Sequence, residues 1–282
     1  MKPEINPLSV MDDVIRDLAA DIGSGDVSAA LLPMDLMVEA EIISREPMLL
    51  CGRPWVDAVF QQINPSIQLK WLEKEGAWLP EPTTLCRIHG AARDVLTGER
   101  SALNFLQTLS ATATQTWQYV QQLKSTKTRL LDTRKTLPGL RMAQKYAVAC
   151  AGGTNHRMGL YDAFLIKENH ITACGSITEA IQRARDSNHK VLLEVEVENL
   201  NELREALTAQ ADRILLDNFT LEMMREAVAI NQAYHCDLEA SGGINLSTIK
   251  AVAETGVDYI SVGAITKSIQ AIDLSLLIRR RF

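Results

Sequence analysis

Short apolar runs alternate with longer amphipathic segments from about residue 114 onward, and this alternation constrains the fold more than any other feature of the sequence. The runs recur roughly every 20 to 30 residues, which is the length of a strand followed by a returning helix. Segments between them, such as 176–185 and 221–230, have apolar residues three or four apart, as amphipathic helices do. The rhythm predicts parallel strands in a barrel or an open sheet. The runs lie at 129–132, 163–167, 191–197, 214–217, 238–241 and 259–263.

Polar residues or glycines lie at or just beyond the C-terminal ends of these runs, and they favour the barrel. Barrel enzymes build their active sites on that face. In the run 191–197, Glu194 and Glu196 alternate with aliphatic residues, so we expect at least one carboxylate to point inward. The residues at the run ends are Arg134, Lys167, Glu196, Asp217, Ser241 and Gly263.

The first hundred or so residues have a different pattern, typical of a separate α+β domain. Residues 38–43 and 84–92 read as strands and 54–63 as a short helix, whereas apolar residues at helical spacing from Leu103 to Val120 predict a helix that links two domains, with Arg100 in its first turn. We place the first domain at 1–113, including the start of this helix, and the barrel at 114–269. The segment 270–282 is a candidate to pack back on the first domain.

Composition narrows the function. The net charge of −6 argues against general nucleic-acid binding, and no apolar run approaches membrane-spanning length, so we expect a cytoplasmic protein. The five cysteines include no Cys-x-x-Cys pair. They predict reduced thiols, and without a Cys/His cluster in the sequence we expect no zinc site.

Cationic residues are concentrated within about forty residues of the second half. Arg134 and Lys135 follow a strand, His156 and Arg157 follow a glycine pair, and Lys167 ends the next run. Because the whole chain is acidic, this cluster predicts a pocket for a multiply anionic small molecule. The alternatives are a solvated strand end for the Arg-Lys pair and a hydrogen-bonded structural role for His156.

Carboxylates and glycine turns supply the other half of the predicted site. Glu196 and Asp217 end successive strands, where they suit ribose hydroxyls, Mg²⁺ or a developing positive charge; alternatively they form a structural network with Lys167. Ser241-Gly242-Gly243 and Gly263-Ala264 follow the last two strands. That is the usual phosphate-binding position of a barrel.

These motifs, in this order, resemble the quinolinate phosphoribosyltransferases, the nicotinate-nucleotide pyrophosphorylases (carboxylating) of NAD biosynthesis. The resemblance implies an α/β fold with an N-terminal α/β sandwich domain and an incomplete seven-stranded α/β barrel. It also implies a homodimer in which the neighbour's N-terminal domain closes each barrel site, and leaves open whether dimers assemble further. The resemblance rests on 21–26, 99–104, 132–136, 155–157, 165–170, 194–198, 216–218 and 261–263.

The implied reaction joins quinolinate to phosphoribosyl pyrophosphate, and gives nicotinate mononucleotide, pyrophosphate and carbon dioxide. Mg²⁺ is the implied cofactor and would accompany the pyrophosphate. Glu196 and Asp217 are candidates to contact it and to stabilise the ribose. Lys135 and Lys167 would neutralise the negative charge of pyrophosphate or 5-phosphate oxygens.

Quinolinate has two adjacent carboxylates that need several cations. The resemblance implies that these cations are Arg134, His156 and Arg157, together with Arg100 of the partner subunit. Two rivals stay open: a related barrel phosphoribosyltransferase for another heterocyclic carboxylate, and a non-catalytic barrel that binds a phosphate ligand. A non-catalytic barrel would not need Glu196 and Asp217 in addition to a cationic pocket, so their combination favours an enzyme.

Overall fold

The computed structural model describes residues 5–187 and 190–282, which form two compact units. One unit contains the residues up to Trp117 together with 136–152 and 268–282, and the other contains 118–135 and 153–267.

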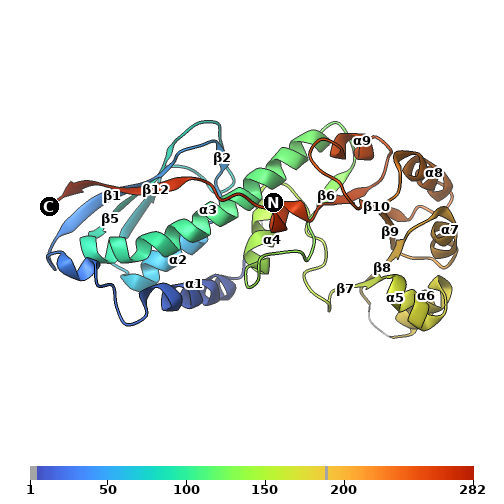
Figure 1. The fold of residues 1–282 in the computed structure, drawn as a ribbon, viewed down its shortest axis with the longest axis horizontal. Helices are drawn as coiled ribbons and strands as arrows, with labels where there is room; N and C mark the ends of the chain where they lie inside the picture. The colour runs from blue at the N-terminus through green and yellow to red at the C-terminus, as the bar shows by residue number, and fades with distance from the viewer. Residues whose placement is uncertain (1–4, 188–189) are drawn as a thin grey trace. The chain divides into compact units, whose positions relative to one another are not determined.

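An antiparallel sheet of four strands organises the first unit, in the order β12 (Leu274–Arg281), β1 (Met37–Ser44), β5 (Thr84–Ala91) and β3 (Gln68–Trp71) (Figure 1). Alternate residues of β1 are buried, as the sequence pattern predicts for a sheet with one face on the core. The last strand of the chain pairs with β1, with Leu276 opposite Ile42. A smaller sheet joins β2 (Met48–Leu49) to β4 (Trp78–Leu79).

Helices α1 (Pro7–Ile22), α2 (Arg53–Ile63), α3 (Ala92–Leu123) and α4 (Arg141–Cys150) contribute to the core of this unit, with the short helix η1 at Ala29–Leu31. Asn6 caps α1, and Pro7 occupies its first turn, where a missing N–H costs nothing. Trp55 is fully buried, and its indole N–H donates to Asp13.

The linking helix α3 begins at Ala92, so the prediction that Arg100 lies in its first turn is wrong by two turns. The chain passes from β5 directly into α3, and Gly98 lies inside the helix. A Cβ at Gly98 would come within 2.8 Å of the Phe60 ring, so close packing against α2 explains the glycine.

Parallel strands form the second unit. The order is β6 (Arg129–Leu131), β11 (Tyr259–Ser261), β10 (Asp237–Ser241), β9 (Arg213–Asp217), β8 (Leu192–Val197) and β7 (Ala163–Ile166). Thr154 forms a parallel bridge to Leu131 on the outer side of β6, so a seventh position is present as a single bridge. No strand in the described residues joins β7 to Thr154, so the barrel is incomplete, as expected.

Helices return between these strands and cover the outside of the sheet (Figure 1). Ser176, Asn199 and Thr220 cap three of them by accepting backbone N–H groups, and the helices predicted at 176–185 and 221–230 are confirmed. Because each helix returns the chain, the C-terminal ends of the strands meet at one edge. The helices are α5 (Glu168–Cys174), α6 (Ile177–Asp186), α7 (Leu200–Thr208), α8 (Leu221–Asn231), α9 (Ile249–Ala253) and α10 (Ala264–Lys267).

Within the described residues, every helix is too short or too polar to span a lipid bilayer.

Candidate active site

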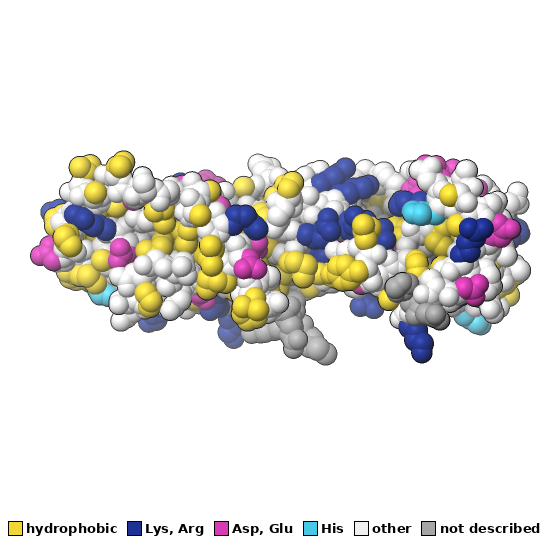
Figure 2. Space-filling model, turned by 90° about the horizontal axis from the view of Figure 1, so that it is seen from below, with side chains coloured by type: hydrophobic (Ala, Val, Ile, Leu, Met, Phe, Trp, Pro, Cys, Tyr) yellow, Lys and Arg dark blue, Asp and Glu magenta, His cyan; other side chains and the backbone are white. Residues whose placement is uncertain are grey.

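A pocket of about 340 Å³ opens at the C-terminal edge of the barrel strands. It brings together seven of the residues that the sequence singled out. They are Arg134, Lys135, His156, Arg157, Lys167, Glu196 and Ser241. Figure 2 shows Lys and Arg side chains gathered on one part of the molecular surface, which agrees with the predicted local concentration of positive charge.

Arg134 and Lys135 lie on the loop after β6. The Lys135 N–H donates to Thr133 Oγ1 at 3.0 Å, and the Thr266 hydroxyl donates to the Lys135 carbonyl at 2.8 Å, so the loop is held at both sides. Arg134 Nε is buried and has no hydrogen-bond partner among the described residues. A buried donor without a partner is costly, and an anionic ligand would satisfy it.

Gly263 lets Lys135 pass close to the end of β11. A Cβ at this position would lie 3.1 Å from Lys135 Cδ. Gly242, after β10, has φ +100° and would place a Cβ only 2.1 Å from Asn218 Oδ1. Gly243 also has a positive φ of 61°, and Ala264 begins α10, so both predicted glycine turns follow the strand ends that form the edge of the site.

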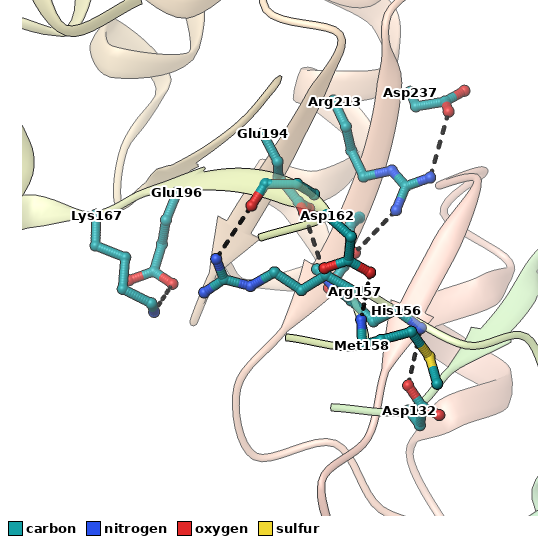
Figure 3. A network of polar contacts seen from close by, with 12 residues as sticks. Asp132, His156, Arg157, Met158, Asp162, Lys167, Glu194, Glu196, Arg213 and Asp237 are labelled. Carbon is teal, nitrogen blue, oxygen red and sulfur yellow. Dashed lines mark hydrogen bonds and ion pairs between the residues drawn. The ribbon is translucent and has the colours of Figure 1, made fainter. Parts of the chain in front are cut away.

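Lys167 and Glu196 form an ion pair across the ends of β7 and β8 (Figure 3). The Lys167 side chain is 45% exposed and the Glu196 side chain 15%, so the pair can change partners when a charged ligand enters. Burial raises the pKa of Asp217, and the charge of Glu196 raises it further, while Lys167 and Lys135 oppose this rise. The four residues therefore share one electrostatic environment.

His156 contacts two carboxylates that sequence reasoning did not select. Its Nε2 lies 2.9 Å from Glu194 and 3.4 Å from Glu239, and both acidic side chains are fully buried. The backbone nitrogen of Arg157 lies 2.7 Å from His156 Nδ1, on the side of the ring away from the two carboxylates. Burial alone would lower the pKa of His156, but the hydrogen bonds to Glu194 and Glu239 raise it to about 9.

Arg213 completes this inner network (Figure 3). Its guanidinium lies 3.8 Å from Glu239, 3.7 Å from Asp237 and 4.1 Å from the centre of the Tyr259 ring. Burial and the charge of Glu239 raise the pKa of Glu194 to about 7. The sequence held a trace of the network, because Glu194 and Glu239 interrupt runs that are otherwise apolar, and charged side chains in such places are almost always paired.

Arg157 lies beside this network and lines the pocket together with Arg134. Its Nη1 donates to the Ala163 carbonyl at 3.3 Å, which orients the guanidinium. Burial lowers the pKa of Arg157, and the like charge of Arg134 lowers it further. Two guanidinium groups that repel each other form a site that an anion stabilises.

Arg100 lies on α3 in the first unit, whereas the residues that line the barrel pocket all belong to the second unit.

Known families match nearly the whole chain. Residues 26–110 match the family model of the quinolinate phosphoribosyl transferase N-terminal domain, and residues 112–277 match that of the C-terminal domain. A probable nicotinate-nucleotide pyrophosphorylase (carboxylating) of Bacillus subtilis is 41% identical, over 91% of this chain and 89% of that protein. A protein of the same description from Synechocystis is 42% identical, over 97% of this chain and 94% of the relative.

Solved structures agree. The nicotinate-nucleotide pyrophosphorylase of Francisella tularensis is 46% identical, covers 99% of both chains and superposes with a TM-score of 0.94. Because both domain models match in order, and these relatives share the chain over most of its length, the chain belongs to the quinolinate phosphoribosyltransferase family.

Proposed function

We propose that the barrel pocket is where quinolinate accepts a phosphoribosyl group from phosphoribosyl pyrophosphate. As a member of its family, the chain is a decarboxylating phosphoribosyltransferase that makes nicotinate mononucleotide in NAD biosynthesis. The observation that carries the assignment of the site is the meeting of Arg134, whose buried Nε has no partner among the described residues, with the Lys167–Glu196 pair in one pocket. A dianionic acceptor and a charged donor need both groups.

Arg134 and Arg157 would bind the two adjacent carboxylates of quinolinate. Their mutual repulsion in the free pocket is relieved when an anion lies between them. His156 would form part of the pocket wall, held by Glu194 and Glu239.

Lys135 and Lys167 would neutralise oxygens of the pyrophosphate or the 5-phosphate. The backbone N–H groups at Ser241-Gly242-Gly243 and Gly263-Ala264 are candidates for the other phosphate contacts. Binding would compete with the Lys167–Glu196 ion pair and free Glu196 for the ribose.

Transfer begins as the bond from the anomeric carbon to pyrophosphate breaks, and the leaving oxygen keeps the electron pair. The ribose then has oxocarbenium character, which Glu196 and Asp217 would stabilise. The lone pair of the pyridine nitrogen forms the new bond to the anomeric carbon. The ring nitrogen becomes cationic and accepts electron density, so the adjacent carboxylate leaves as carbon dioxide and a proton from water replaces it.

The outer carboxylates fit the proposed magnesium ion. Glu196 and Asp217 offer hard oxygen donors, and the charge of Glu196 raises the pKa of Asp217, a cost that a divalent cation removes. When bound, Mg²⁺ supplies charge neutralisation of the departing pyrophosphate. Glu196 and Asp217 would hold it together with the pyrophosphate oxygens.

We also propose a homodimer in which Arg100 completes the site of the partner subunit. A mixture of Arg100→Ala and Lys167→Ala chains tests this, because a heterodimer would carry one site with both residues intact. Partial recovery of activity supports the shared site. If mass spectrometry shows subunit exchange and no activity returns, the shared site is wrong.

Release of carbon dioxide from quinolinate, in the presence of phosphoribosyl pyrophosphate and Mg²⁺, tests the reaction itself. Nicotinate and other pyridine carboxylates are the comparison acceptors. Faster product formation with another acceptor would support the rival substrate, and no product with any acceptor would support a non-catalytic barrel.

A further inference from the structure

A second group of reactive side chains lies in the first unit and takes no part in the proposed reaction. The thiols of Cys51 and Cys150 and the carboxylate of Glu75 place one ligand atom each within 4.8 Å of one another. We call this group the Cys51 cluster. We propose that the Cys51 cluster binds one borderline-soft divalent cation, of which Zn²⁺ is the type, through two thiolates and one carboxylate.

The distances suit such an ion. Zinc binds sulfur at about 2.3 Å and carboxylate oxygen at about 2.0–2.2 Å, so the ligand atoms of a tetrahedral site lie roughly 3.5–3.8 Å apart. The three atoms of the Cys51 cluster lie within 4.8 Å, so rotamer shifts of an ångström or so would close the shell. Water would occupy the fourth position, on the side of the partly exposed Cys150.

The backbone already holds Cys51 and Glu75 in place. The Cys51 N–H donates to the Ser110 hydroxyl at 3.1 Å, and that hydroxyl donates back to the Cys51 carbonyl at 2.9 Å. Glu75 accepts from the N–H groups of Gly52 and Arg53 at the start of α2, at 2.8 and 3.2 Å. Ligands that are fixed before the ion arrives lose little conformational entropy on binding it.

Glu75 also has the outer hydrogen bonds that metal-binding carboxylates require. The Tyr146 hydroxyl and the Gly52 N–H both donate to Oε1, and the Arg53 N–H donates to Oε2, so the carboxylate is held in place and Oε2 keeps a second lone pair that can face an ion. These donors also offset the excess negative charge of a site with three anionic ligands and one divalent ion.

Cys150 is the last residue of α4, and the backbone of Gly76 passes beside it. A Cβ at Gly76 would lie 3.3 Å from the Cys150 sulfur. Gly76 also has φ +81°, so glycine suits this position on both counts. The segment that carries Glu75 is thereby brought next to the C-terminal end of α4.

A disulfide is the other product that two neighbouring thiols could form. Burial raises the pKa of Cys51 well above its ordinary value, and the neighbouring Cys150 and Glu75 raise it further. Thiols of this kind react slowly with oxidants, because the thiolate is the nucleophile. Without a cation, the Glu75 carboxylate repels the thiolate form of Cys51. With a cation between them, both anionic groups are attracted to the same ion.

Cobalt(II) is the probe that distinguishes this site from the barrel pocket. Thiolate ligands give cobalt an intense near-ultraviolet charge-transfer band that carboxylate and imidazole ligands do not give. We expect the reduced, tag-free full chain, stripped with a chelator, to develop this band with one equivalent of Co²⁺ and to lose it when Zn²⁺ is added.

Variants place the band on the proposed ligands. Cys150→Ser and Glu75→Gln, both at partly exposed positions, should bind Co²⁺ roughly tenfold more weakly or worse. Cys51→Ser should do the same, with circular dichroism as the check on its folding. Cys236→Ser, a cysteine of the other unit, is the matched control and should keep the full band.

Three results would overturn the proposal: no charge-transfer band in the reduced parent chain, a full band in Cys150→Ser, or a purified chain that, unfolded in a chelator without reductant, has only three titratable thiols and yields a peptide in which Cys51 and Cys150 are linked. The last result would mean that Cys51 and Cys150 form a disulfide. The barrel reaction does not enter this experiment, so its outcome is independent of the proposed function.

Discussion

Two pairs of carboxylates in the barrel differ in depth and in what they can do. The outer pair, Glu196 and Asp217, lies at the strand ends, where Glu196 contacts a half-exposed Lys167. The inner pair, Glu194 and Glu239, is fully buried and contacts His156. An outer carboxylate can exchange its partner in the protein for substrate at a small cost in free energy. If an inner carboxylate lost its partner, a buried charge would be left unpaired, which is strongly destabilising. We therefore expect the outer pair to govern turnover and the inner pair to govern stability.

Removing one inner carboxylate should have the largest effect. Glu239→Ala leaves His156 and Arg213 without their shared partner, and we expect a loss of about 3–5 kcal/mol in the free energy of unfolding. Urea denaturation measures it. Glu198→Ala, an exposed carboxylate just beyond β8, is the control and should change the free energy by no more than about 0.5 kcal/mol. Equal stability of the two variants would end the distinction between the pairs.

Removing one outer charge should affect the reaction instead. Asp217→Asn should lower turnover by roughly ten- to a thousandfold, because the charge is needed most in the transition state. Quinolinate affinity and unfolding free energy should stay near those of the parent. Steady-state kinetics and calorimetric titration measure these quantities. Near-normal turnover would show that Asp217 does not stabilise the ribose.

A cation of the pocket extends the comparison from the carboxylates to the positively charged residues. Arg134 belongs to the outer layer, and Arg134→Ala should weaken quinolinate binding by about 1.5–3 kcal/mol while the protein stays folded. Arg134→Lys should recover part of the affinity, since a lysine keeps the charge but not the forked hydrogen bonds. Calorimetry on these variants, with the exposed Arg204→Ala as control, measures the effect. Unchanged affinity in Arg134→Ala would remove this residue from the quinolinate site.

The smallest expected effect is a pH dependence of stability that belongs to the inner layer. Glu194, at about 7, and His156, at about 9, both have a folded-state pKa above the unfolded value. Such groups stabilise the fold at low pH, and the contribution is lost as the pH rises through the folded pKa. The contribution of Glu194 is lost between its ordinary pKa of 4.5 and about 7, and that of His156 between its ordinary pKa of 6.5 and about 9. We therefore expect the free energy of unfolding to fall from about pH 5 to about pH 9, by at most about 1.4 kcal/mol per pH unit for one proton. Glu194→Gln should flatten this slope, and an equally steep slope in that variant would contradict the role of the inner network.

The positions of the residues at the strand ends could be predicted from the sequence, because each of them lies at the C-terminal end of an apolar run. Lys167, Glu196 and Asp217 directly follow apolar runs, and the ends of parallel strands meet at one edge whatever the lengths of the connecting helices. Arg134 and Lys135 follow the same rule after β6. The family motifs then added roles that position alone does not assign.

The inner layer could be predicted only in part. The alternation in 191–197 correctly indicates an inward carboxylate, but it does not show that Glu239 and His156 meet Glu194. The registers of β8 with β9 and of β9 with β10 set the relation between Glu194 and Glu239, and the loop after Thr154 brings in His156. The predicted start of α3 was two turns late, because the apolar spacing behind it begins only at Leu103, whereas the helix begins at Ala92. Inside its first turns, Gly98 packs against Phe60, which lies 38 positions earlier in the chain.

The sequence by itself determined the strand and helix rhythm, the edge at which the barrel site lies and the family. Those features depend on periodicity and on ordered motifs, which are local properties. The sequence offered 270–282 as a segment that packs on the first domain, but only the tertiary structure made it a strand paired with β1. Only the tertiary structure placed two acids beside His156 and assembled the Cys51 cluster from Cys51, Glu75 and Cys150. The sequence predicted no zinc site, because its cysteines form neither a Cys-x-x-Cys pair nor a cluster with histidines. Contacts between distant segments follow from how the whole chain packs its apolar surface, so no short window of sequence contains them.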